Sequence, residues 1–436
     1  MASRGDINLQ EIQPAFDGNW QSLPFDSSLG LTGLYTKIKS SECQDDGLYP
    51  VVDQGEKYIS GYINDSDLIY KGELPVIIFG DHTRNVKYID FEFAVGADGT
   101  KILSPIKQIN SKFFYYYLRA LNIPNLGYSR HYSILKQIEV PLPPLAEQKR
   151  IADKLDILLG QLETIRRAAD HIPELIKKFR QQILTYAVTG KLTEKWRKKN
   201  IFANEYFNIN SSKHREYNTI VPDNWCLLSF NDVVTIESNL VNPDDFLNLP
   251  LIAPDNIESM TGRLISKPLV SEIAPISPKH YFNSDTLIYS KIRPYLSKIV
   301  YVDFEGLCSA DMYPLKTQLN IFYLYFYMLS SEFLAFATTA GERIVLPKIN
   351  QKSLNVIPVP IPPLEEQEEI VRRVQSLFEK LDTIEQRYQT LKIKLENLPQ
   401  ALLYKAFKGE LVKQLPSDGN AADLLREIEQ FKKSLK

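Results

Sequence analysis

The chain has 436 residues, 44% of them hydrophobic, so it is too long for one ordinary domain and apolar enough to form more than one core. Its net charge of −2 does not mark it as a nucleic-acid-binding protein, and its three scattered cysteines form no CxxC pair, which argues against a disulfide framework and a zinc site. It has no charged-then-apolar leader and no apolar run of about 20 residues, so we expect a cytoplasmic protein without a membrane span.

The first expected domain, residues 1–143, is a globular segment with a net charge of −4. A strand-like run, Val76–Phe79, precedes a polar stretch that contains Arg84 and Lys87. A second polar stretch, near the end of the segment, holds Arg130, His131 and Tyr132. Side chains of these types contact bases and phosphates, so all five are candidates for binding DNA. The alternative that each is a solvated surface residue stays open.

An aromatic run, Phe113–Leu118, has a counterpart at Phe322–Met328 in the second half of the chain. Aromatic platforms stack the bases of single strands. Both runs, however, occupy matched places and precede helix-like amphipathic sequence. We therefore predict that both are helical and pack into cores.

The second expected domain, residues 144–200, is a helical spacer region with a net charge of +6. Prolines before it favour an extended approach, and Glu147 suits the first turn of a helix. Apolar residues then recur at alternating steps of four and three until Pro173 interrupts the pattern. The residues expected in this helix-pair seam are Ile151, Leu155, Leu158, Leu162 and Ile165.

The third expected domain, residues 201–363, is a second globular segment, again with a net charge of −4. The strand-like run Leu287–Tyr289 precedes a basic loop in which Pro294 fixes one backbone angle. A polar stretch again lies just upstream of the proline motif, as in the first segment. The candidate DNA-binding residues here are Lys291, Arg293, Tyr295, Lys298, Arg343, Lys348 and Asn350.

The fourth expected domain, residues 364–436, repeats the helical region. The sequence VPLPPLAEQ at 140–148 recurs as VPIPPLEEQ at 359–367, an offset of 219 residues that continues into the helix. The matching seam residues are Ile370, Val374, Leu377, Leu381 and Ile384.

The two seams predict an antiparallel coiled coil, because each helix leaves one globe and heads toward the other. The expected fold is therefore α+β, with two α/β globes separated by two long helices and related by a pseudo-two-fold axis. A helix of about 26 residues is ~39 Å long at ~1.5 Å per residue. One turn of B-DNA is ~34–36 Å, so such a spacer suits two reading heads about one turn apart. Packing of each helix on its own globe alone is the alternative.

The chain offers no motif for catalysis. It has no GxxxxGK[ST] phosphate loop, no Asn-Pro-Pro-aromatic motif of adenine methylation, and no metal-ligand spacing among its five histidines. We expect no catalytic residue, no metal site and no cofactor in this chain, and a standalone nuclease or methyltransferase is disfavoured.

The doubled proline motif, each copy preceded by a globe and followed by a long helix, resembles the specificity subunit of type I restriction–modification enzymes. The segments FGDHTR at 79–84, GYSRHY at 127–132 and KIRPYLSK at 291–298 also resemble target-recognition domains of that family. The resemblance covers nearly the whole chain. It implies that each globe is a target-recognition domain for half of a gapped double-stranded DNA sequence, and that the helices set the gap and dock two methyltransferase (modification) subunits.

The resemblance also implies that the chemistry belongs to partners. S-adenosylmethionine is expected on the modification subunits, and ATP and Mg²⁺ on restriction (translocase and nuclease) subunits. A second hypothesis remains, in which the coiled coil is an assembly scaffold and the acidic globes bind proteins rather than DNA.

Overall fold

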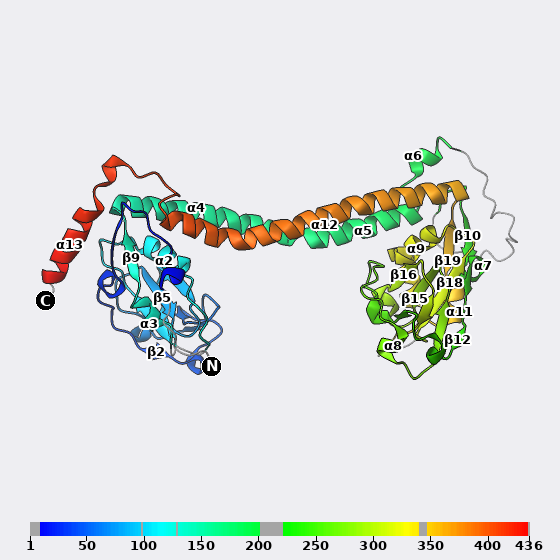
Figure 1. Ribbon diagram of the computed structural model, residues 1–436, viewed down its shortest axis with the longest axis horizontal. Coiled ribbons are helices and arrows are strands. Elements are labelled where there is room, and N and C mark those ends of the chain that lie inside the picture. Colours follow the sequence, from blue (N-terminus) through cyan, green and yellow to red (C-terminus); the bar gives the residue numbers. More distant parts are fainter. Residues whose placement is uncertain (1–8, 97–98, 128–129, 201–220, 340–346, 435–436) are drawn as a thin grey trace. The chain divides into compact units, whose positions relative to one another are not determined.

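The computed structural model describes residues 9–96, 99–127, 130–200, 221–339 and 347–434. The chain forms two compact units: unit 1 is Met1–Asp170 with Thr390–Lys436, and unit 2 is His171–Gln389. Each unit holds one α/β globe and a pair of helical segments (Figure 1). Two α/β globes with long helices were expected, and this fold class is confirmed.

The globe of unit 1 contains two sheets and a two-stranded ribbon. One sheet has the order β6-β5-β8 and the other β2-β7-β3-β4, and the ribbon pairs β1 with β9. The strands are β1 Gln21–Pro24, β2 Lys37–Ile38, β3 Tyr49–Val52, β4 Gly61–Ile63, β5 Val76–Gly80, β6 Val86–Ile89, β7 Ala94–Gly96, β8 Thr100–Leu103 and β9 Glu139–Leu142. The helices of the globe are α1 Leu9–Ile12, α2 Ser111–Ala120 and α3 Tyr132–Leu135. Strand β5 is buried at every residue, because it is central in its sheet and is covered on both faces.

The globe of unit 2 repeats this plan. Its sheets have the orders β11-β18-β15-β16 and β12-β14-β17-β13, and its ribbon pairs β10 with β19. The strands are β10 Cys226–Ser229, β11 Val234–Ile236, β12 Leu240–Val241, β13 Leu251–Ile252, β14 Lys279–Phe282, β15 Thr286–Ser290, β16 Ile299–Val302, β17 Gly306–Cys308, β18 Met312–Thr317 and β19 Pro358–Ile361. The helices are α7 Phe230–Val233, α8 Val270–Ile273, α9 Ile321–Leu329, α10 Ser331–Thr339 and α11 Gln351–Asn355.

The aromatic runs are helical and buried, as predicted. They form α2 and α9, and each helix begins at an asparagine, Asn110 or Asn320, whose side chain caps its first turn. The Tyr117 hydroxyl donates to the carbonyl of Glu139 at 2.5 Å, and Tyr323 donates to that of Pro360 at 2.6 Å. These hydroxyls tie each aromatic helix to the proline-containing strand, so the rings are core residues rather than a stacking surface. Within the described residues no single helix is long and apolar enough to span a membrane; the bent pair α9–α10 passes by length and composition alone.

The long helices follow the predicted breaks. Helix α4, Leu145–Asp170, ends just before the predicted interruption, and α5, Ile172–Val188, starts with a proline in its first turn. Helix α12, Leu364–Phe407, is one helix of 44 residues that contributes to both units. The remaining helices are α6 Glu194–Arg197 and α13 Ala421–Ser434.

Each unit pairs two of these helices in antiparallel fashion (Figure 1). In unit 2, Arg180 of α5 forms an ion pair with Asp382, and Thr193 beyond α5 binds Glu366 near the start of α12. In unit 1, Ile151 of α4 shares a core with Phe407, the last residue of α12. In unit 2 the order of these contacts is opposite along the two partners, and in unit 1 the start of α4 shares a core with the end of α12.

The seam is shorter than predicted. Ile151 and Leu155 are fully buried, as are Ile370 and Val374, because all four also face the core of a globe. Leu162 and Leu381 are buried, and Leu158 and Leu377 are partly buried. Ile165 and Ile384, however, stay 51% and 46% exposed, so their place in a buried seam was wrong. A globe covers only the first turns of each helix, and farther along a helix pair alone leaves apolar side chains uncovered.

A glutamate and a glutamine fasten each helix to its globe. Gln148 accepts from the backbone of Asn110 at 2.8 Å, and Gln367 accepts from Asn320 at 2.9 Å. Glu147 accepts from the indole of Trp20 at 3.3 Å, and its counterpart Glu366 from that of Trp225 at 2.9 Å. All four motif side chains are almost completely buried. The repeated Glu-Gln pair is therefore a structural joint that fixes the orientation of each globe relative to its own helix.

The seam gives a direct test of stability. Replacing buried Leu381 by aspartate places a charge inside the helix pair, and we expect a loss of about 3 kcal/mol in the free energy of unfolding. Ile384→Asp, three residues away at a half-exposed position, is the matched control and should cost less than about 1 kcal/mol. Urea denaturation followed by circular dichroism measures both. Equal losses in the two variants would contradict a seam at Leu381.

Candidate nucleic-acid interface

In the globe of unit 1, the two predicted polar stretches meet at one end of the central sheet. The loop that follows β5 begins at Asp81, whose carbonyl accepts a hydrogen bond from the backbone of His131 at 2.8 Å. The Asp81 carboxylate accepts another from the backbone of Tyr132, also at 2.8 Å. Residues about 50 positions apart in the sequence therefore form one surface. The sequence predicted each stretch but not their contact.

Three of the five candidates in unit 1 reach this surface. Arg130 is exposed, and Tyr132 is half-buried with its ring near two cations. Arg84 has a positive φ of 64°, uncommon for a residue with a side chain, and its guanidinium donates to the carbonyl of Ile123 at 2.9 Å. That bond leaves further donors of the guanidinium for a ligand.

Two candidates in unit 1 were wrong, because their side chains are internal. Lys87 is 5% exposed and binds the carbonyl of Asp53 at 2.8 Å, and burial lowers the pKa of its ammonium group. His131 is fully buried, with Nδ1 2.9 Å from the carbonyl of Asp81 and Nε2 accepting from the backbone of Leu126. Both hold loops in place instead of offering a group to DNA.

Sequence reasoning missed two lysines that complete this surface. Lys101 on β8 lies 5.4 Å from the centre of the Tyr132 ring, and Lys136 lies 5.6 Å from it. Alternation along β8 could have placed Lys101 on the outward face, but only the fold brings it to Tyr132. Gln54 was also missed. Its carbonyl and side chain accept from Asn85 and from the backbone of His82, which shapes the loop after β5.

In the globe of unit 2, the corresponding stretches also meet. The backbone of Arg293 donates to the carbonyl of Pro347 at 2.8 Å, and that of Ile349 donates to Lys291 at 2.9 Å. The loop after β15 is thus bonded to the segment before α11, as the loop after β5 is to the segment before α3. In both globes, therefore, the two predicted polar stretches meet at the same topological position, the loop after a central strand.

Four of the seven candidates in unit 2 are exposed on this surface. Arg293 is exposed with φ +51°, and its guanidinium has no hydrogen bond or ion pair with a described residue. Tyr295 is half-exposed, and Asn350 caps α11 by accepting from the backbone of Ser353 at 2.8 Å. Lys348 forms an exposed ion pair with Asp311 at 3.2 Å. The seventh candidate, Arg343, lies outside the described residues.

Two candidates in unit 2 were wrong for the same reason as Lys87. Lys291 is largely buried, binds the carbonyl of Ala310, and has its pKa lowered by burial and then by nearby Lys348. Lys298 is also largely buried and binds the carbonyl of Pro254 at 2.7 Å. Both ammonium groups donate to backbone carbonyls of neighbouring loops. Arg293, which lies between the two lysines in the sequence, keeps its charged group exposed to solvent. Among the described residues no cluster of three or more His, Cys, Asp or Glu could hold a metal ion.

Comparison with known proteins decides what these paired surfaces belong to. The family model for the type I restriction modification DNA specificity domain matches residues 34–173 and 255–393, one copy in each half of the chain. The chain belongs to this family. It is a DNA specificity subunit, a recognition component and not a catalytic one.

Curated relatives span nearly the whole of this specificity subunit. It is 37% identical over 414 residues to the specificity subunit of the type I restriction enzyme EcoDI of Escherichia coli, covering 90% of this chain and 91% of the relative. It is 27% identical over 445 residues to the EcoBI specificity subunit of the same species, with coverage of 94% and 92%.

Solved structures agree on the fold. The HsdS subunit from Thermoanaerobacter tengcongensis matches with a TM-score of 0.57 at 15% identity, covering 91% of this chain and 98% of that one. A chain from a study of assembly and conformational transition of the type I R-M system matches with a TM-score of 0.62, also at 15% identity, covering 91% and 99%. The two-globe, long-helix architecture is therefore that of a specificity subunit.

Proposed function

We propose that each globe of this specificity subunit reads one half of a gapped, double-stranded DNA sequence with the surface at the end of its central strand. In unit 1 the reading groups are Arg84, Arg130 and Tyr132, supported by Lys101 and Lys136. In unit 2 they are Arg293, Tyr295, Lys348 and Asn350. Arginine and asparagine side chains match base edges in the major groove, and lysine and tyrosine hold phosphates. The observation that carries this proposal is the convergence of two polar stretches at the same topological place in both globes.

The long helices set the distance between the two half-sites. Helix α4, with 26 residues, has the expected length of ~39 Å, close to one turn of B-DNA at ~34–36 Å. Helix α12, which contributes to both units, has 44 residues and is longer than expected, ~66 Å or close to two turns. From the sequence repeat alone, we further propose that a pseudo-two-fold axis relates the two globes. The same repeat is the basis for domain boundaries at residues 143, 200 and 363.

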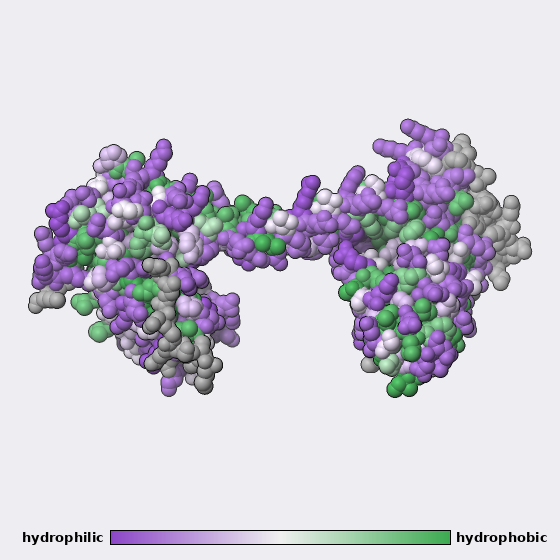
Figure 2. Space-filling model, in the orientation of Figure 1, coloured by the Kyte–Doolittle hydropathy of each residue, from purple (hydrophilic) through white to green (hydrophobic). Residues whose placement is uncertain are grey.

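The helices also dock two methyltransferase subunits, which carry S-adenosylmethionine, while restriction subunits bring ATP and Mg²⁺. Exposed apolar side chains on the helices support a docking role. Leu175 and Phe179 lie one turn apart on α5 and are each at least half exposed, and Figure 2 shows apolar patches along the otherwise hydrophilic helices. We propose that the assembled complex works in the cytoplasm.

A domain exchange tests whether each globe recognises one half of the DNA sequence independently of the other. Replacing residues 20–139 by the same segment of a relative should change one half of the methylated sequence and leave the other half and the gap unchanged. Sequencing of methyladenine in DNA from cells that carry the exchanged subunit and its methyltransferase measures this. A change in both halves, or in neither, would contradict one globe per half-site.

The scaffold alternative is tested by salt. If the globes bind phosphates, footprints of the assembled complex should weaken steeply as salt rises, because counterions are released on binding. DNA binding that does not depend on salt would favour the scaffold hypothesis. The net negative charge of both globes is the observation that supports this alternative.

A further inference from the structure

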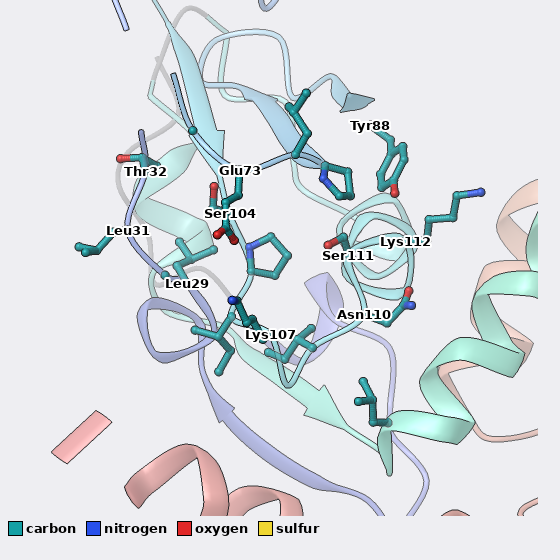
Figure 3. A pocket seen from close by; sticks show the side chains of 18 of the residues that line it. Leu29, Leu31, Thr32, Glu73, Tyr88, Ser104, Lys107, Asn110, Ser111 and Lys112 are labelled. Carbon is teal, nitrogen blue, oxygen red and sulfur yellow. The ribbon is translucent and has the colours of Figure 1, made fainter. Parts of the chain in front are cut away.

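Unit 1 contains a large open pocket that the recognition surface does not use. Its cavity volume is about 1450 Å³, and it is lined by residues 29–33, 72–75, 104–107 and 109–112, by Tyr88, by the start of α4 and by the end of α13 (Figure 3). Small-molecule pockets usually measure ~300–1,000 Å³. This pocket is larger and open, which suits a segment of another protein better than a metabolite.

The pocket lies at the far end of the central sheet from the proposed DNA surface. Its residues Leu74 and Pro75 immediately precede β5, whereas the recognition loop follows Gly80 at the other end of that strand. Five residues of strand cover about 17 Å. Ser104 and Pro105 follow β8, which runs antiparallel to β5, so they lie at the same far end. A DNA duplex bound at the recognition loops is therefore an unsuitable occupant.

The walls of the pocket are apolar and largely uncovered. Leu31 is 92% exposed, and Leu74, Leu145 and Phe431 are each more than one-third exposed. These residues come from two loops, from the start of α4 and from α13, so the apolar surface is assembled from four segments of unit 1. Exposed apolar side chains gathered around one cavity are typical of a protein-binding surface.

The charges around the pocket select an acidic partner. Four lysines line it, against one acidic residue, Glu73. Lys112 is paired with Asp156, and Lys432 lies 3.3 Å from the carbonyl of Leu29. Lys107 and Lys149 are exposed and have no ion pair with any described residue. Two free ammonium groups beside apolar walls are complementary to a segment that carries both carboxylates and large apolar side chains.

We propose that this pocket receives an acidic, apolar segment of the methyltransferase subunit. The inference rests on the proposed docking of that subunit to the helices, and the first turn of α4, one of those helices, forms part of the pocket wall. It assigns a specific contact to unit 1 beyond the helices themselves.

Charge reversal tests the proposal. The double variant Lys107→Glu/Lys149→Glu should weaken binding of the full-length chain to purified methyltransferase by about tenfold or more, since two attractive contacts become repulsive. The control Lys37→Glu/Lys57→Glu reverses two exposed charges of unit 1 that neither line the pocket nor lie on the long helices, and should stay within about twofold of the parent chain. Equal affinities of the two double variants for methyltransferase would overturn the proposal.

Crosslinking identifies the occupant. A benzophenone amino acid in place of Leu31 should crosslink, in the assembled complex, to an acidic peptide of the methyltransferase. The same group at Leu48, 74% exposed and not part of the pocket, should not. Crosslinks from position 31 to DNA, to a second copy of this chain or to no partner would overturn the proposal. Complexes that still form should methylate an unchanged gapped sequence, so loss of this contact is distinguishable from failure of the proposed function, in which even the parent complex methylates no gapped sequence.

Discussion

Glu366→Gln should destabilise unit 2 by about 3 kcal/mol. The Glu366 carboxylate is 1% exposed and accepts hydrogen bonds from Arg197 at 2.6 Å, Thr193 at 2.7 Å and Trp225 at 2.9 Å. The amide keeps the shape of the side chain but removes its charge. The largely buried guanidinium of Arg197 then loses its ionic partner. Breaking a buried ion pair costs ~3–5 kcal/mol, and we expect the lower end because the amide oxygen of glutamine still accepts a hydrogen bond.

The same change in unit 1, Glu147→Gln, should cost almost nothing. Glu147 occupies the matching place in the motif, but its hydrogen bond is to the indole of Trp20 at 3.3 Å, which an amide oxygen also accepts. Burial raises the pKa of Glu147 above its usual range. The folded chain therefore holds the proton more tightly than the unfolded chain, and the stability from this group falls as pH rises from the ordinary carboxyl range through the raised pKa. At neutral pH the glutamine variant should be within about 0.5 kcal/mol of the parent, or slightly more stable.

Hydrogen exchange measured by mass spectrometry separates these two effects, because peptides from the start of α12 report on unit 2 and those from the start of α4 on unit 1. Urea denaturation gives the overall change. Adding Arg197→Met to Glu366→Gln removes the unpaired charge and should restore part of the loss. Equal destabilisation by the two single substitutions would show that the charge of Glu366 is not what stabilises its joint.

The repeat made much of the architecture predictable. An offset of 219 residues predicted two globes and two helical regions, and steps of four and three predicted the helices and the break before Pro173. The repeated motif also matched Glu147 with Glu366, but the sequence could not predict that Trp20 and Trp225 donate hydrogen bonds to these two carboxylates. Their hydrogen bonds join residues 127 and 141 positions apart, and such pairing arises only when the sheet and helix are folded together.

The proposed recognition surface was predictable in part from the sequence. The predicted loops after the central strands do lie at the surface, since polar groups between apolar runs must reach it. Lys87 and Lys298 nevertheless turn inward, because carbonyl oxygens of distant loops, at Asp53 and Pro254, accept their ammonium groups. A basic residue in a loop has the same local pattern whether it faces solvent or a carbonyl from elsewhere in the chain. The burial of the His131 imidazole, which the sequence placed among the DNA-binding candidates, could not be predicted for the same reason.

Arg293→Ala should weaken binding of the assembled complex to its DNA, or relax its preference within the half-site read by unit 2, by about 1–3 kcal/mol. The Arg293 backbone has φ +51°, its N–H donates to the carbonyl of Pro347, and its carbonyl accepts from Leu296, so the loop fixes the position of the Arg293 backbone and leaves the guanidinium exposed. A residue held in this uncommon region of backbone space often belongs to a binding site. Alanine keeps the same backbone contacts, so the stability of unit 2 should change little.

Arg293→Lys separates reading of a base from binding of a phosphate. Lysine retains the charge but loses the planar pair of donors that matches the edge of guanine. If Arg293 reads a base, the lysine variant should lose discrimination at one base pair while keeping most of its affinity; if it binds a phosphate, affinity and preference should both be preserved. Fluorescence anisotropy with duplexes that differ by one base pair measures both quantities. Lys298→Ala is the matched control from the same loop, and it should lower the stability of unit 2, because its ammonium group binds the carbonyl of Pro254, without changing which base is preferred. Wild-type affinity and base preference in Arg293→Ala would exclude Arg293 from the interface and leave Tyr295, Lys348 and Asn350 to account for recognition by unit 2.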